Sequence, residues 1–407
     1  MLHLDLIHTV AFGGLVLLLG HGLRRWIPVL GRVNIPAAVL GGLLVSVVAW
    51  IGHACDVQLF DFDTTLQSPL MIAFFTTVGF AASLSLLRVG GPQVVKFLLL
   101  CSGFALLQNL LGVFLSWALG LPLPFGLLAG SVTLTGGPAT GLAFAPLFEQ
   151  AGVTGAASIA VAMGMAGIVS GALVGGPIST WLIHRHGLHS HGNARAQLVA
   201  EHIADEIAPP LPQVGAASED DDQVFPLLKN LIALLVAMWV GYWISLLIEK
   251  SGVTMPAYIG AMLAAAVIRN IDDRFGWLRL SPRVFDTMGA IALSLFLVIA
   301  LMNLKLWDLA GLALPLVVML LAQILLVAFG AALVFARMGR DYESAVMSGG
   351  FIGFMLGTTA NAMAVMRALA DRYGPAPRAF LVAPLVGSFF IDFVNGLLIT
   401  AGINLLK

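Results

Sequence analysis

Two glycine-bearing stretches combine residue types that suit the binding of cations and carboxylates. The first is TLTGGPATGLAF at 133–144, and the second is GFMLGTTANAMA at 353–364. Thr and Asn oxygens suit a hard cation such as Na⁺, and glycine lets a ligand approach the backbone. A helix that begins in such a stretch also offers free N–H groups to a carboxylate. The expected substrate-binding residues are Thr135, Gly136, Gly137, Thr140, Gly141, Gly357, Thr358, Thr359 and Asn361.

A second candidate feature is an acid in the middle of the last apolar run. Asp392 is the one carboxylate deep in this run, and Asn395 follows three residues later, on the same helical face. Inserting an acid at membrane depth costs a few kcal/mol of free energy, so such a residue is first interpreted as functional. We expect Asp392, Asn395 and Thr133 to ligate Na⁺. The alternatives are that Asp392 carries a proton, pairs with an arginine or caps a broken helix.

The composition predicts that these residues lie in a membrane. The chain has 407 residues, of which 59% are hydrophobic and only 10% charged, and its mean hydropathy is +0.98. Soluble domains carry about 25% charged residues. Many charge-free runs reach the roughly 20 residues that a helix needs to cross a bilayer. We therefore expect an all-α polytopic membrane protein, and the net charge of −1 gives no reason to expect nucleic acid as a partner.

Span counting predicts two inverted five-span repeats, each with a re-entrant hairpin. The expected spans lie near 4–23, 34–55, 69–88, 95–118 and 155–183 in the first repeat, and near 227–248, 253–269, 285–304, 309–336 and 378–403 in the second. The first repeat is 1–183, with a hairpin at about 124–148, because the charge-free run between Lys96 and Glu149 is too long for one crossing. The second is 227–407, with a hairpin at about 344–367. VNIPA at 33–37 recurs as VTMPA at 253–257, and Gly137 and Gly357 repeat at the same offset. An odd number of spans per repeat inverts the second one, as in many secondary transporters.

The distribution of positive charge predicts the orientation. If both termini lie outside and the polar linker 184–226 is cytoplasmic, only Lys250, Lys305 and Lys407 of the 20 Lys and Arg residues face outside. This split follows the positive-inside rule. The linker is rich in histidine, and either a metal site or an ordinary solvated segment would account for His184, His186, His189 and His191.

Motifs of enzymes are not found in the sequence. It has no phosphate-binding loop followed by Lys, no His-Glu-x-x-His and no nucleophile elbow. The glutamines in LLQNLL and LAQILL, Gln108 and Gln323, are expected to be interhelical hydrogen-bond partners rather than ligands. The residues thus predict a transporter of a small carboxylate. A channel and a membrane scaffold or receptor without transport are the rivals.

The chain also resembles the bacterial glutamate:sodium symporter family over nearly its full length. Six segments carry the resemblance in order: NIPAAVLGGLL (34–44), DTTLQSPLMIAFFTTVGFAASLSLLRVGG (63–91), GLLAGSVTLTGGPATG (126–141), LSLFLVIALMNLKLWDLA (293–310), GFMLGTTANAMAVM (353–366) and GSFFIDFVNGLLI (387–399). The resemblance implies Na⁺-coupled uptake of L-glutamate, the bacterial inner membrane, a homodimer and an elevator-like movement of the substrate-holding part.

The departures from the family pattern fall at the two glycine-bearing stretches. Pro138-Ala139 stands where the family has His-Gly, Phe351-Ile352 where it has His-Cys, Met355 where it has a further glycine, and Thr359–Ala362 where it has Thr-Pro-Thr-Ala. Asp392 and Asn395 are kept. The expected function is therefore symport of Na⁺ with glutamate or a closely related small organic anion. A proton-coupled or exchange transporter of another carboxylate is the alternative.

Overall fold

A computed structural model describes residues 2–27, 35–190, 192, 197–198, 200–201, 224–250 and 256–406. These residues are mostly helical, in agreement with the predicted all-α class. Two short strands were not expected from the sequence. Strands β1 (Leu2–Leu4) and β2 (Phe60–Phe62) pair in parallel, with Leu2 opposite Phe60.

Seven helices among the described residues are long and apolar enough to cross a membrane. They are Leu6–Trp26, Ala37–Ala54, Gly91–Ala118, Ala156–His186, Leu227–Glu249, Pro282–Met302 and Ala313–Met338. Each coincides with an expected span, so the chain is a polytopic helical membrane protein. The expected spans at 69–88, 253–269 and 378–403 take other forms. The first is a shorter helix, the second carries charges in its last turns, and the third is divided by a π turn.

The helices form two compact units, and each unit takes segments from both sides of the central linker. The first unit comprises Met1–Ser83 and Leu211–Ala310, and the second comprises Leu84–Pro210 and Gly311–Lys407. These units differ from the predicted repeats, which divide the chain in sequence order into 1–183 and 227–407. The division into repeats stays a prediction.

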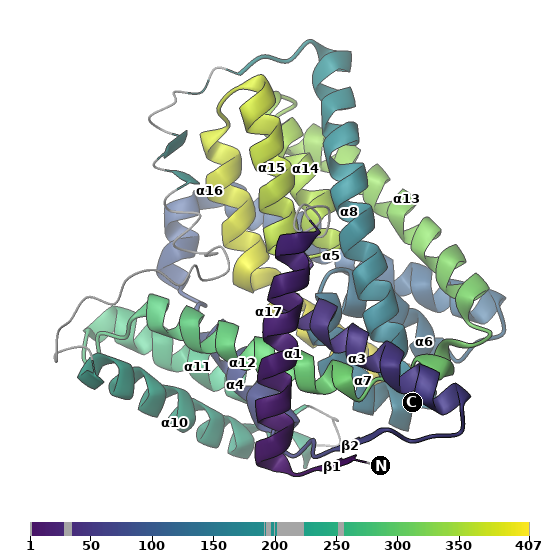
Figure 1. Ribbon diagram of the computed structural model, residues 1–407. Helices are drawn as coiled ribbons and strands as arrows, with labels where there is room; N and C mark the ends of the chain where they lie inside the picture. The colour runs from purple at the N-terminus through teal and green to yellow at the C-terminus, as the bar shows by residue number, and fades with distance from the viewer. Residues whose placement is uncertain are drawn as a thin grey trace. The chain divides into compact units, whose positions relative to one another are not determined.

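In the first unit, small residues let helices pack at backbone distance. Its helices are α1 (Leu6–Trp26), α3 (Ala37–Ala54), α4 (Gln67–Phe80), α10 (Val224–Glu249), α11 (Ala257–Phe275), α12 (Pro282–Met302) and the 3₁₀ turn η3 (Leu306–Leu309). Helix α10 lies along α11, which packs on α4 (Figure 1). A side chain at Gly260 would meet the carbonyl oxygen of Gly241 and the hydroxyl of Ser245. Such close crossings are typical of membrane helices.

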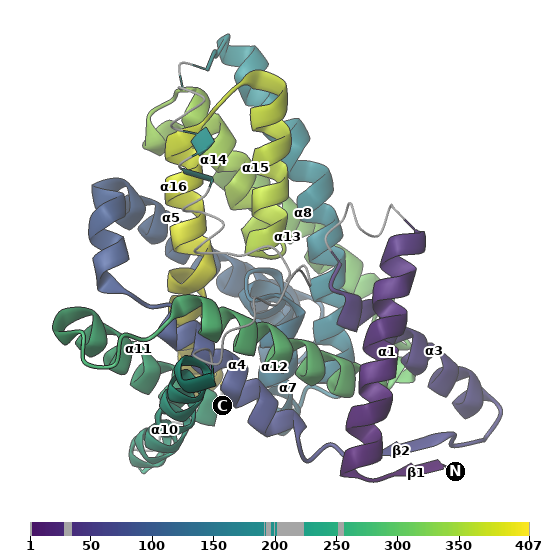
Figure 2. The ribbon, with the colours of Figure 1, turned by 60° about the vertical axis from the view of Figure 1, so that its left-hand side comes forward.

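The second unit contains two helices that are interrupted at glycines. Its elements are α5 (Leu84–Ala118), α6 (Leu123–Leu127), the π turn η1 (Leu128–Val132), α7 (Gly137–Gln150), α8 (Ala156–His186), α13 (Ala313–Met338), α14 (Tyr342–Met355), α15 (Thr359–Tyr373), α16 (Pro377–Leu385), the π turn η4 (Val386–Phe390) and α17 (Ile391–Leu406). Figure 2 shows α14, α15 and α16 side by side, next to α8.

Local sequence explains both interruptions. The first lies before α7, where Gly137 has a φ of +70°, a conformation that glycine adopts freely, and Pro138 occupies the first turn of the new helix. The second lies between α14 and α15, where the extended Thr358 accepts a hydrogen bond from Asn361 N at 3.3 Å as the N-cap. We call these interruptions the first break (Thr135–Gly137) and the second break (Met355–Thr358).

Large apolar side chains also cover outward faces of the helices. Trp239 of α10 is 65% exposed, and Leu325 and Phe329 of α13 are 71% and 69% exposed. In water such surfaces would promote aggregation, whereas lipid chains match them. The outer surfaces of both units therefore suit a bilayer.

Candidate functional site

The two breaks lie against each other inside the second unit. A Cβ placed on Gly137 would stand 3.5 Å from the carbonyl oxygen of Gly357 and 3.6 Å from Cγ2 of Thr358. The hydroxyl of Thr135 lies 3.8 Å from the sulfur of Met355. Residues more than 200 positions apart are therefore neighbours, as the paired motifs predicted.

Gln108 of α5 forms hydrogen bonds with both breaks. Its side-chain Nε2 donates to the carbonyl oxygen of Met355 at 3.0 Å, and its Oε1 accepts from the Thr135 hydroxyl at 2.6 Å. The backbone oxygen of Gln108 accepts from Nε2 of Gln323 at 2.8 Å. The expectation that both glutamines are interhelical hydrogen-bond partners is confirmed.

Asn361 offers a buried acceptor without a partner. Its Nδ2 donates to the carbonyl oxygens of Ile168 and Gly353, at 3.1 and 3.3 Å. The side chain is fully buried, and its Oδ1 has no hydrogen-bond partner among the described residues. A buried unpaired acceptor costs about 1–3 kcal/mol, so this oxygen favours a donor or a cation brought by a ligand.

The helix that begins at the first break has a free N-terminus. The N-cap of α7 is Gly136, and no side chain caps the helix. At the second break, by contrast, Thr358 caps α15. The first turn of α7 therefore keeps a partial positive charge that can attract a carboxylate.

Three other predicted residues have mainly structural contacts. Gly141 faces α8, where an added Cβ would stand 2.7 Å from Cβ of Ala160. The side chain of Thr140 covers Gly136, and the hydroxyl of Thr359 donates to the carbonyl oxygen of Gly387 in η4 at 2.5 Å. The structure gives these residues packing and anchoring contacts around the breaks.

The predicted cation ligands are only partly brought together. Asn395 exchanges two hydrogen bonds with Ser131 of η1: its Nδ2 donates to the Ser131 carbonyl at 3.0 Å, and its Oδ1 accepts from the Ser131 hydroxyl at 2.6 Å. The hydroxyl of Thr133 donates to the carbonyl oxygen of Leu128 at 2.8 Å. The carboxylate of Asp392 is half-buried and has no hydrogen-bond or ion-pair partner among the described residues.

Sequence reasoning missed Ser131 and Asn109. Oδ1 of Asn109 accepts from the backbone N–H of Ser131 at 3.1 Å, next to Gly130, whose backbone is not helical. The π turn η1 exposes this N–H, and π turns often occur at functional sites. A usable signal was present, because Asn109 stands in the run without charged residues between Lys96 and Glu149.

Helix α8 presents glycines to both breaks. A Cβ on Gly164 would stand 2.9 Å from Cγ of Pro138, and one on Gly171 would stand 2.9 Å from Nδ2 of Asn361. Gly167, between them, would meet the carbonyl oxygen of Leu356 at 2.6 Å. These three glycines thus let both breaks pack closely against the backbone of α8.

Close packing within α14 and α15 gives a first prediction. A Cβ on Gly353 would stand 2.5 Å from Cα of Ala362, so Gly353→Ala must separate the two helices. We expect the unfolding free energy to fall by about 1–3 kcal/mol, as for other overpacked sites, with a lower melting temperature in detergent. Gly176→Ala, at a glycine where an added Cβ would meet no atom of another element within 4 Å, is the control. Equal melting temperatures for the two variants would contradict the prediction.

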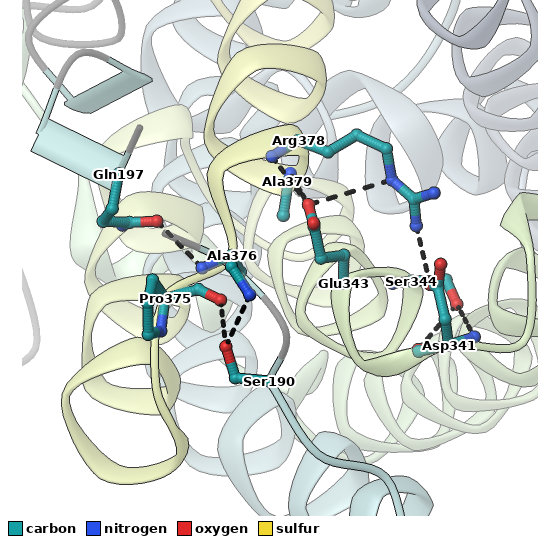
Figure 3. Close-up of polar contacts among 10 residues, drawn as sticks. Ser190, Gln197, Asp341, Glu343, Ser344, Pro375, Ala376, Arg378 and Ala379 are labelled. Atoms are coloured by element: carbon teal, nitrogen blue, oxygen red, sulfur yellow. Dashed lines mark hydrogen bonds and ion pairs between the residues drawn. The ribbon is translucent and has the colours of Figure 1, made fainter. Parts of the chain in front are cut away.

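Ionic contacts join the N-termini of α14 and α16. Nη2 of Arg378 lies 2.6 Å from Oδ1 of Asp341, and its Nε lies 3.8 Å from Oε2 of Glu343 (Figure 3). The same Glu343 oxygen accepts from the backbone N–H groups of Arg378 and Ala379, at 2.6 and 3.3 Å. These contacts fix one side of the turn between α15 and α16.

The segment that follows α8 holds the other side of this turn. The Ser190 hydroxyl donates to the carbonyl oxygen of Pro375 at 2.6 Å, and Oε1 of Gln197 accepts from the backbone N–H of Ala376 at 2.8 Å (Figure 3). His184 contacts Tyr373 and His186 contacts Phe335, His191 lies outside the described residues, and no three His, Cys, Asp or Glu side chains, His189 included, gather as a metal site among the residues that are described. The described start of the linker therefore helps to hold the turn between α15 and α16.

The Arg378 contacts give a second prediction, with a defined pH dependence. Burial raises the pKa of Asp341, but hydrogen bonds from Ser344 and the Arg378 guanidinium outweigh it and hold the pKa below its usual value. This carboxylate thus stabilises the fold above about pH 4, and the contribution is lost as the pH falls through the lowered pKa. Arg378→Met should cost about 1 kcal/mol at pH 7 and less at acidic pH.

Thermal unfolding in detergent between pH 3 and pH 8 measures this effect. Arg337→Met is the control, because Arg337 is exposed and has no ion pair among the described residues. A loss that stays constant down to pH 3 would mean that Arg378 acts through packing alone.

Comparison with known proteins places this architecture in a family. A family model described as sodium/glutamate symporter matches residues 2–375. A sodium/glutamate symporter of Haemophilus influenzae is 36% identical over 96% of this chain and 95% of its own length. One of Escherichia coli is 37% identical over 98% and 97%.

Among solved structures, a sodium proton antiporter from Methanocaldococcus jannaschii aligns with 98% of both chains, at 16% identity and a TM-score of 0.42. The match of the family model and the two relatives extends over nearly the whole chain, including both breaks and Asn361. The chain therefore belongs to the sodium/glutamate symporter family.

Proposed function

We propose that this chain is a secondary transporter that couples the inward movement of Na⁺ to the uptake of L-glutamate. Family membership and the names of the two relatives support the substrate and the coupling ion. One structural observation carries the mechanism: two broken helices meet at Gly137 and Gly357, beside the unpartnered oxygen of Asn361. Relatives named as symporters also support transport and not enzymatic catalysis.

In this proposal the two broken segments are re-entrant hairpins of inverted repeats. Non-helical backbone at membrane depth is tolerated only where protein or a watery cavity surrounds it. The segment that begins near Leu121 has no charge at its start, whereas the start of the second segment carries Arg337 and Arg340 as well as Asp341 and Glu343. This contrast supports hairpins that enter from the outer and the inner face respectively, in an inner membrane with both termini outside.

The substrate's charged groups match the groups at the breaks. Glutamate carries two carboxylates and one ammonium group. The free N-terminus of α7, at Gly137, suits a carboxylate, and Oδ1 of Asn361 suits the ammonium group as an acceptor. Thr135 and Thr358 flank these positions and can add hydroxyl contacts to the substrate.

Sodium binds, in this proposal, around Asp392, with Asn395 and Thr133 as further oxygen donors. The support is the partnerless carboxylate of Asp392 and the bond between Asn395 and Ser131, which brings α17 to the segment that contains Thr133. One charge moved through 100 mV supplies about 2.3 kcal/mol. All candidate residues belong to one compact unit, as an elevator-like movement of the substrate-holding part of a homodimer requires.

Uptake by purified protein in proteoliposomes tests the proposal. We expect labelled L-glutamate to accumulate when Na⁺ is outside and not when choline replaces it. Accumulation driven by a proton gradient in Na⁺-free buffer would instead support a proton-coupled carboxylate transporter, which the partnerless Asp392 also permits. Aspartate and dicarboxylates as competitors define the substrate range.

A further inference from the structure

We propose that Gln108 is a positioning residue that joins the two breaks into one binding unit, so that Na⁺ and glutamate strengthen each other's binding. This inference rests on the proposed function, because it concerns the same site. It adds a residue on α5, outside both interrupted segments, whose effect on the ligands would act through Thr135 and Met355.

The argument starts from the chemistry of the side-chain amide. Gln108 is fully buried, and its two polar atoms serve different breaks. Oε1 accepts from the Thr135 hydroxyl, and Nε2 donates to the Met355 carbonyl. Met355 is the last residue of α14, so this carbonyl belongs to a helix end that lacks intrahelical partners. A single amide thus satisfies one group from each break.

The position of Gln108 is itself fixed. Its backbone oxygen accepts from Gln323 of α13, which is also fully buried. If the second break shifts, the Met355 carbonyl moves, and Gln108 must shift or lose its bond to Thr135. A shift of one break is therefore transmitted to the other through the side chain of Gln108. Coupling of this kind is measurable as a change in the affinity for one ligand caused by the other, typically 5- to 150-fold.

Binding measurements on the purified full chain test the inference. The readout is the ratio of the glutamate Kd without Na⁺ to the Kd at saturating Na⁺. Gln108→Met keeps the shape of the side chain and removes both hydrogen bonds, so we expect the ratio to fall by about tenfold. Ser348→Ala is the control. Ser348 is also fully buried, and its hydroxyl donates to the carbonyl oxygens of Ala331 and Ser344 rather than to Gln108 or a break, so the ratio should stay close to that of the wild type.

A double-mutant cycle separates positioning from a general loss of stability. If Gln108 acts through Thr135, the double variant Gln108→Met with Thr135→Val should lower the ratio no further than Thr135→Val alone. If Gln108→Met does not fold, Thr135→Val alone removes the same bond from the other side and should lower the ratio. An unchanged ratio in Gln108→Met, or an equal fall in Ser348→Ala, would overturn the inference.

A second readout does not depend on transport. Spin labels at Ala139 and Ala360, in a background that lacks Cys55 and Cys101, report the separation of the breaks by dipolar broadening. We expect Gln108→Met to weaken the broadening, and unchanged spectra would overturn the inference. If wild-type protein neither binds nor transports glutamate while Gln108→Met still weakens the broadening, the proposed function fails and the structural bridge stands.

Discussion

Asp392→Asn is expected to abolish Na⁺-driven glutamate uptake in proteoliposomes. The carboxylate has no protein partner among the described residues, so its negative charge is available to a cation. A neutral amide keeps the size of the side chain but removes the charge that offsets the cost of taking Na⁺ out of water. We expect uptake to fall to the level of empty liposomes, while the melting temperature in detergent rises or stays unchanged.

Two further variants sharpen this result. Asp371→Asn removes an exposed carboxylate from the end of α15 and should leave uptake unchanged. Asp392→Glu keeps the charge and should retain partial activity with a weaker affinity for Na⁺. Normal uptake by Asp392→Asn would remove this residue from the mechanism, whatever the behaviour of the other two.

Asn361→Ala is expected to raise the KM for L-glutamate by about 10- to 100-fold, the loss of one hydrogen bond to a charged group. Its Oδ1 is the buried acceptor that the substrate ammonium group would satisfy. Glutarate has the same two carboxylates and no amino group. The wild type should therefore prefer L-glutamate to glutarate as a competitor, and Asn361→Ala should lose most of this preference.

The control for Asn361 is another buried polar residue of the same broken segment. The hydroxyl of Ser348 donates to the carbonyl oxygens of Ala331 and Ser344, at 3.0 and 2.8 Å. Ser348→Ala should lower stability and leave the preference for L-glutamate intact. If Asn361→Ala also keeps that preference, the ammonium group binds elsewhere.

The positions of the breaks could be predicted from local chemistry. Gly136, Gly137 and Pro138 interrupt an apolar run, and Thr358 stands where a capping residue must stand before a new helix. The membrane class followed in the same way from composition and run length. These features depend on neighbours in the sequence, which is why sequence reasoning could reach them.

Contacts between distant segments were beyond this reasoning. Nothing in the order of residues specifies that Ser131 meets Asn395, or that Asn361 turns its Nδ2 to α8 and leaves its Oδ1 without a partner. Paired motifs predicted that the two breaks are close, yet they gave no hint that Gln108 lies between them. Span counting also took 378–403 as one span, because a π turn within an apolar run leaves no mark on the run's length or composition.

The two π turns have a consequence for how this chain tolerates change. A π turn holds one more residue than the α-helical turn it replaces. Deleting one residue from η4 would therefore leave a regular α-helical turn and keep the residues on both sides in register. Deleting one residue inside α17, before Asn395, would instead rotate all that follows by about 100°, and Asn395 would then point away from Ser131. A one-residue deletion should thus be tolerated better within η4 than in the regular winding next to it.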